Sequence, residues 1–239
     1  MGRFAALRQR FRPRGEGTIF VLSGGAVRGA AQVGMLRAVL EHGVVPDQVV
    51  GVSAGALNGL VLASDPTLER LSLLEEVWAQ AAEKSPIRGS VLRNMAAIIR
   101  GHPSFDNGER LRELIAANVP VEDISQTEIP FHLATTAAST GRHVWWSKGP
   151  SVELLCASAA MPGVLPAVEL SDGDHHMDGG VVSNIPLRYA LSLQPARLVV
   201  FDVAAPFLPP EKQPALSVMM TGFRAAAAEL TRQQWRDVP

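Results

Sequence analysis

The chain has 239 residues, of which 47% are hydrophobic and 19% are charged, so it can bury a sizeable core and wholesale disorder is excluded. Its 22 basic and 23 acidic residues give a net charge of -1, which argues against a dedicated nucleic-acid-binding protein because such proteins carry a basic surface. The one cysteine, Cys156, excludes an intramolecular disulfide and argues against a thiolate zinc site. We expect it to be a small core residue.

Residues 1–17 are basic, with arginines among scattered apolar residues. They contain no apolar run followed by a small-residue cleavage site, so they do not resemble a secretory signal. We interpret them as a solvated tail, with a weak tether to an anionic membrane as the alternative. No stretch in the sequence approaches the ~20 apolar residues that cross a bilayer. We therefore expect a cytoplasmic protein whose contact with a membrane, if it makes one, is peripheral.

Strands and helices alternate in the first part of the sequence. Residues 18–23 form a short apolar run bounded by glycines, which is typical of a buried parallel strand. A glycine-rich turn and a mostly apolar helical pattern follow, and the same order then recurs. This alternation predicts a parallel sheet with right-handed crossovers. The predicted elements of this part are strands at 18–23 and 48–52 and helices at 29–42, 54–64 and 68–84.

The pattern is less regular over residues 85–107, where we expect the apolar stretch 91–99 to form a helix over a pocket. Beyond it, the sequence predicts strands at 131–138, 143–147, 175–177 and 198–203, and helices at 109–118, 152–160 and 215–235. No internal repeat or clear linker interrupts these elements. We therefore expect residues 18–239 to form one domain.

A G-x-S-x-G motif, Gly51 to Gly55, lies directly between a predicted strand and a predicted helix. A serine in this context sits on a sharp turn that exposes its hydroxyl, and the two glycines leave room for the turn and for a substrate. The N-terminus of the following helix favours a developing negative charge nearby. The simpler interpretation is a small-residue turn that only packs well, but the strand–turn–helix context favours Ser53 as a nucleophile.

A second glycine-rich loop, Gly24 to Gly29, follows the first predicted strand. A dinucleotide-binding turn would have a third glycine where Ala26 stands and an acidic residue at the end of the second strand, which instead leads into Ser53. The alternative is that backbone N–H groups of this loop form an oxyanion hole while Arg28 fixes the loop or balances charge. If the first two strands are neighbours, both loops reach the same edge of the sheet.

A nucleophilic serine needs a base, and the sequence offers two kinds. Pairing Asp106 with His132 or His143 stays open but has no motif around it. Asp178 is the better candidate, because Gly179 and Gly180 have no side chains and would let its carboxylate approach a hydroxyl. His175 and His176 point to opposite faces of a strand, which argues against a shared metal ion, and we expect both at the surface or at the rim of the site.

Together these segments resemble the patatin-like phospholipase family. The resemblance runs from about residue 18 to residue 203 and includes the oxyanion loop at 22–30, the nucleophile elbow at 51–55, the segment 157–166, and the Asp-Gly-Gly motif with residues 182–187 after it. The chain is most similar to the small bacterial, single-domain type related to the catalytic domain of neuropathy target esterase. The segment 206–239 fits the family less clearly.

The resemblance implies a three-layer α/β/α fold with a mainly parallel central sheet. It also implies a lipid acyl hydrolase without metal or cofactor, in which Ser53 is the nucleophile and Asp178 the proton acceptor. The implied oxyanion hole comprises Gly24, Gly25, Ala26, Arg28 and Gly29, and the backbone N–H groups of the first three are its hydrogen-bond donors. The implied supporting glycines are Gly51, Gly55, Gly179 and Gly180.

Ala26 departs from the family, which usually has glycine there. If this position needs a positive φ, the Cβ atom costs on the order of 1 kcal/mol and shifts an N–H donor. Two alternatives therefore stay open, a catalytically silent lipid-binding or regulatory protein and an acyltransferase. The expected partner is an acyl-ester lipid, either a phospholipid or a lysophospholipid. The sequence specifies neither its acyl chain and head group nor the oligomeric state.

Overall fold

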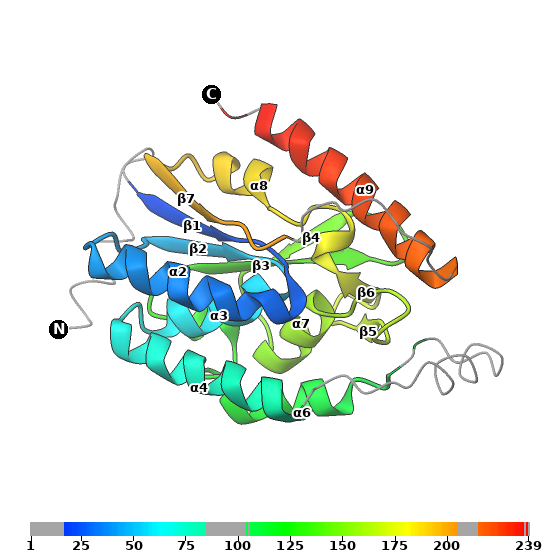
Figure 1. Cartoon of the computed structure of the whole chain (residues 1–239), viewed down its shortest axis with the longest axis horizontal. Coiled ribbons are helices and arrows are strands. Elements are labelled where there is room, and N and C mark those ends of the chain that lie inside the picture. The colour runs from blue at the N-terminus through cyan, green and yellow to red at the C-terminus, as the bar shows by residue number, and fades with distance from the viewer. Residues whose placement is uncertain (1–16, 85–103, 105, 205–214, 237, 239) are drawn as a thin grey trace.

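The computed structural model describes residues 17–84, 104, 106–204, 215–236 and 238 (Figure 1). The predictions for the basic tail and for a helix at 91–99 fall outside these residues. Within them, a seven-stranded sheet runs through the middle of the molecule in the order β5-β6-β3-β2-β1-β7, with β4 paired to β3. The strands are β1 (Thr18–Leu22), β2 (Gln48–Gly51), β3 (Phe131–Ala137), β4 (His143–Trp146), β5 (Val168–Glu169), β6 (His175–Asp178) and β7 (Arg197–Phe201).

Helices cover both faces of this sheet, which gives three layers (Figure 1). The helices are α2 (Gly29–Glu41), α3 (Ala54–Ser64), α4 (Leu68–Lys84), α6 (Glu109–Asn118), α7 (Ser151–Ser158), α8 (Leu187–Ser192) and α9 (Ala215–Arg236). The larger core lies between the sheet and the layer that contains α2, α3 and α7. A smaller core on the opposite face joins β1 and β2 to α8. The α/β fold predicted from the sequence is confirmed.

The parallel strands form one half of the sheet and the antiparallel strands the other. Strand β1 lies between β2 and β7 and is parallel to both, and β2 is parallel to β3. The neighbouring β1 and β2 bring their following loops to one edge, as expected. Strands β4 and β6 run antiparallel to β3, and β5 antiparallel to β6. The sequence did not predict β5 or α8, which have two and six residues and therefore little periodicity.

Two strands meet head to head along one edge of β3. Leu133 pairs with Gly51 of β2 on one edge and with β4 on the other. Thr135, two residues further along, pairs with β4 and with Asp178 of β6. Strand β6 must therefore use the same edge as β2, and it runs in the opposite direction. The end of β2 and the end of β6 thus face each other, although about 130 residues separate them.

Among the residues that the structure describes, no helix has the length and apolar character needed to cross a bilayer.

Candidate active site

Ser53 occupies a sharp turn between β2 and α3. Its backbone has φ 55° and ψ −124°, a conformation that L-residues rarely adopt and that is found at functional turns. The turn is tightly packed: a Cβ atom on Gly51 would lie 2.5 Å from the carbonyl oxygen of Gly55, and one on Gly55 would collide with the backbone of Leu22. Both flanking positions of the motif therefore require glycine, and the strained serine has 9% of its surface exposed.

Asp178 ends β6 beside this turn, as the head-to-head strands require. Its carboxylate accepts a hydrogen bond from the backbone N–H of Gly180 at 2.7 Å and interacts with the Ser53 hydroxyl. The side chain is 5% exposed, and burial raises its pKa to about 6, while the hydrogen bonds from Ser53 and Gly180 oppose the rise. Gly179 packs so closely on β3 that a Cβ atom would lie 2.5 Å from the carbonyl oxygen of Ala134.

The glycine-rich loop after β1 lies next to Ser53. Gly24 is bound twice by Asn184: it donates its N–H to the Asn184 carbonyl oxygen at 3.1 Å and accepts from the Asn184 side chain at 3.0 Å. The Gly24 amide is therefore already used within the protein. The amides of Gly25 and Ala26 have no acceptor among the residues that the structure describes. These two are the candidate oxyanion donors of the loop.

Ala26 has φ 49°, so this position does require the left-handed conformation that favours glycine. Arg28 fixes the loop, because its Nε donates to the carbonyl oxygen of Val203 at 2.7 Å beyond the end of β7. Gly29 begins α2, and a Cβ atom there would lie 2.5 Å from the ring of Trp78. Gly29 thus shapes the loop by its close packing on α4, whereas Arg28 both fixes the loop and lines the space in front of Ser53.

Two cavities meet at Ser53, and both also contact Ala26 and Met161. The first, of about 320 Å³, lies among α3, α4, α6 and α7 and is almost entirely apolar. Its lining includes Leu57, Val61, Val77, Trp78, Leu114 and Leu165. The second, of about 300 Å³, contains Asp178 and is lined by both charged and neutral side chains. Its lining also includes Asp202 and, from α9, Ala227, Ala228 and Thr231.

The histidines proposed as alternative bases have other partners. His132 contacts the hydroxyl of Tyr189 at 3.0 Å, and burial lowers its pKa to about 4. The Nε2 atom of His143 lies 2.6 Å from the carbonyl oxygen of Gly179, and burial lowers its pKa as well. His143 thus contacts the backbone just beyond Asp178. Cys156 is buried as expected, and its pKa is raised to about 11 by that burial.

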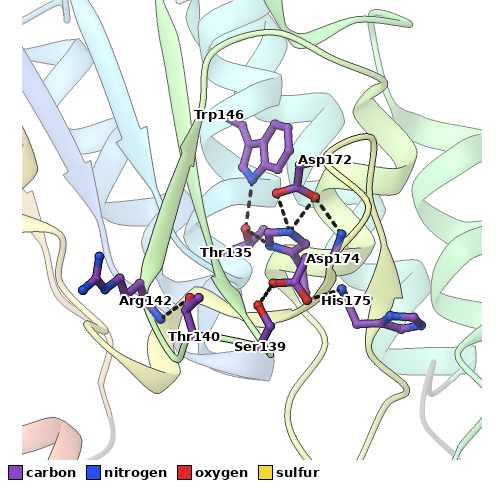
Figure 2. A network of polar contacts seen from close by, with 9 residues as sticks. Thr135, Ser139, Thr140, Arg142, Trp146, Asp172, Asp174 and His175 are labelled. Atoms are coloured by element: carbon purple, nitrogen blue, oxygen red, sulfur yellow. Dashed lines mark hydrogen bonds and ion pairs between the residues drawn. The ribbon is translucent and has the colours of Figure 1, made fainter.

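The expectation that His176 lies at the surface or rim is wrong. It is fully buried, whereas His175, which points to the other face of β6, is exposed. Polar partners satisfy the buried ring: its Nδ1 lies 2.8 Å from the Thr135 hydroxyl and its Nε2 lies 3.0 Å from the Asp172 carboxylate. Figure 2 shows Thr135, Asp172 and Trp146 of this network. Trp146 also donates to Thr135, at 2.9 Å. The network anchors β6 to β3 and β4 behind Asp178.

A second set of contacts in Figure 2 secures the turns at the same end of the sheet. Ser139 hydrogen-bonds the carboxylate of Asp174, which also accepts the backbone N–H of His175. The backbone N–H of Arg142 donates to the hydroxyl of Thr140. The described residues contain no group of three or more His, Cys, Asp or Glu side chains arranged to hold a metal ion.

Comparison with known proteins places these features in context. The family model described as Patatin-like phospholipase matches residues 20–191. Neuropathy target esterase sws of Drosophila melanogaster is 28% identical over 186 residues, which are 77% of this chain and 13% of that protein. Patatin-like phospholipase domain-containing protein 7 of Mus musculus is 27% identical over 192 residues, 80% of this chain and 14% of that protein. Both relatives are thus far longer than this chain.

Among solved structures, the crystal structure of VipD from Legionella pneumophila is similar over 73% of this chain and 47% of that chain, with a TM-score of 0.43 and 15% sequence identity.

Proposed function

The chain belongs to the patatin-like phospholipase family, and we propose that it is a serine lipid acyl hydrolase in which Ser53 is the nucleophile and Asp178 the base. The observation that carries this proposal is that a strained serine and a buried carboxylate, whose pKa is raised to about 6, line the same cavity. A base works best when its pKa lies near the operating pH, and an ordinary aspartate is too acidic for that role. The family assignment supports lipid ester hydrolysis in general.

In the proposed reaction, the Ser53 hydroxyl attacks the acyl carbonyl carbon and transfers its proton to Asp178. The amides of Gly25 and Ala26 donate hydrogen bonds to the oxyanion that forms. The tetrahedral intermediate then expels the alcohol, which takes the proton from Asp178, and leaves an ester on Ser53. A water molecule, activated by the same carboxylate, attacks this ester and releases the fatty acid.

The two cavities suggest how a lipid binds. The apolar cavity suits the acyl chain, since burial of each methylene group contributes roughly 0.8 kcal/mol. The second cavity, with Arg28 and Asp202 among its lining, suits the polar alcohol part of a phospholipid or lysophospholipid. Val27, which is 76% exposed and also lines the apolar cavity, supports the proposal of a peripheral contact with the lipid surface.

We also propose that residues 18–239 act as one catalytic domain. Strand β7, which lies beyond the residues matched by the family model, forms one edge of the sheet and pairs with β1 along its whole length. Helix α9 adds side chains to the second cavity. A truncated chain ending at residue 191 should therefore fail to give a cooperatively folded, active protein, and a cooperative unfolding transition with full activity would contradict the proposal.

Covalent labelling tests the nucleophile directly. A fluorophosphonate probe should modify Ser53 in the wild-type protein and leave Ser53→Ala unmodified, with mass spectrometry locating the adduct. Hydrolysis should then be measured on a panel of phospholipids, lysophospholipids and short p-nitrophenyl esters for both proteins. Absence of labelling in correctly folded wild-type protein would contradict the hydrolase and favour the catalytically silent alternative, which the left-handed Ala26 motivates.

A further inference from the structure

Ser158, the last residue of α7, lies at the junction between the two strands that carry Ser53 and Asp178. Its side chain is fully buried. The hydroxyl oxygen accepts the backbone N–H of Ser53 at 3.0 Å, and the hydroxyl donates to the carbonyl oxygen of Ala134 at 2.8 Å. One side chain therefore connects the nucleophile's own backbone to the central strand β3.

The position of Ala134 explains why this connection is needed. In the register of β3, Ala134 lies between Leu133, which pairs with Gly51, and Thr135, which pairs with Asp178. Strand β2 ends at one of these neighbours and β6 ends at the other. The Ala134 carbonyl thus lies where the two strands meet, and it accepts the Ser158 hydroxyl there. The hydroxyl takes the place of a strand partner at the junction.

The same hydroxyl acts on the most strained part of the site. Ser53 has φ 55°, and its amide leaves the strand pairing just as the chain turns into α3. A strained conformation persists only where surrounding contacts determine it. The hydrogen bond from the Ser53 amide to Ser158 is such a contact. Through Ser158 it fixes the turn to β3, the strand that also pairs with Asp178.

We propose that Ser158 is a positioning residue for hydrolysis: through its hydroxyl it sets the placement of Ser53 relative to Asp178. This inference rests on the proposed function. Loss of the hydroxyl leaves the buried Ser53 amide without an acceptor and lets the turn shift. A displacement of about 1 Å at a reacting group lowers the rate by roughly 100-fold, so we expect kcat to fall between about 10- and 100-fold, with KM for a short p-nitrophenyl ester changed less than about twofold.

A matched control lies on the same helix. Ser151, the first residue of α7, is also fully buried, but its hydroxyl oxygen has no hydrogen-bond partner among the described residues. Ser151→Ala therefore removes a buried serine hydroxyl from α7 without breaking a bond to either catalytic strand. It should leave both kcat and KM within about twofold of the wild-type values.

The experiment compares Ser158→Ala, Ser158→Cys and Ser158→Thr with Ser151→Ala and wild type. Cysteine fills the space but is a weak hydrogen-bond partner, so it keeps the test valid if the alanine variant does not fold. Threonine keeps the hydroxyl and should recover most of the lost kcat. Each variant is also ¹⁵N-labelled, and exchange of the Ser53 amide proton should be at least about tenfold faster without the hydroxyl.

Two outcomes would overturn the proposal. One is a folded Ser158→Ala or Ser158→Cys protein with kcat within about twofold of wild type and unchanged Ser53 amide exchange. The other is an equal loss of kcat in Ser151→Ala, which would indicate a general effect on α7. Amide exchange does not depend on catalysis, so it tests the Ser158 contact even if wild-type Ser53 resists the fluorophosphonate probe and the proposed function itself fails.

Discussion

Replacement of Asp178 by asparagine should abolish hydrolysis and, at neutral pH, stabilise the protein. The variant keeps the size of the side chain and an oxygen for the Gly180 amide, but it removes a buried negative charge. Burial raises the pKa of Asp178 from 3.8 to about 6, so the folded protein binds this proton more tightly than the unfolded chain does. The stability from this group is therefore complete below the unfolded pKa and is lost as the pH rises through the folded pKa.

The size of the effect follows from the two pKa values. A shift from 3.8 to about 6 corresponds to about 3 kcal/mol of lost stability once Asp178 is ionised, at 1.36 kcal/mol per pH unit. About half of this loss is already present at pH 5, and the whole of it at pH 8. The stability advantage of Asp178→Asn over wild type should thus grow by roughly 1 to 2 kcal/mol between these two pH values.

Urea unfolding of both proteins at pH 5 and pH 8, followed by circular dichroism, measures this difference. Asp178→Glu, which keeps the charge, serves as the control and should not show the same gain. If the difference in free energy of unfolding between wild type and Asp178→Asn were the same at both pH values, the carboxylate would not be held at a raised pKa. Retained hydrolysis by the asparagine variant would show that another group is the base.

Three further predictions concern the same site. In a pH–rate profile, kcat/KM should fall tenfold per unit below a pKa of about 6, because the base must be ionised; a flat profile down to pH 4.5 would contradict this. Ala26→Gly should raise kcat, because glycine adopts the left-handed conformation without strain. The free energy of unfolding should change by less than about 1 kcal/mol, because glycine also loses more entropy on folding. A lower kcat would contradict the idea that strain at Ala26 misplaces its N–H donor. Gly55→Ala should give little soluble, folded protein, because its Cβ atom would meet the Leu22 backbone; a wild-type yield and melting temperature would refute the close approach.

The sequence predicted those parts of the site that short segments determine. The turn around Ser53 and the Asp178 motif each combine a chemically active residue with glycines, and such patterns can be read without knowing the fold. The parallel arrangement of the first strands followed from the alternation of strands and helices and is confirmed, and β1 and β2 are also neighbours, which the sequence left as a condition. From the sequence, a cost at Ala26 was expected only if this residue has a positive φ, and the structure gives it a φ of 49°.

Long-range contacts determine the rest, and no local pattern contains them. The role of the Gly24 amide depends on Asn184, a residue 160 positions away, and the sequence could not show that this donor is already engaged. His176 is buried because Thr135 and Asp172 satisfy both ring nitrogens, whereas a single sequence shows only a polar residue near a turn. The contact between Ser158 and Ser53 is of the same kind.

The arrangement along β3 supports the proposal that Asp178 acts as the base without a histidine between it and the serine. The head-to-head strands bring Asp178 directly to the Ser53 hydroxyl in a site with little exposure to water. That lack of water raises the pKa of Asp178 to about 6, which makes the carboxylate roughly 100 times more basic than an ordinary aspartate. The same burial costs about 3 kcal/mol of stability when the group is ionised. The protein can bear this cost because hydrogen bonds to Gly180, to Ser158 and within the His176 network hold the two strand ends in place.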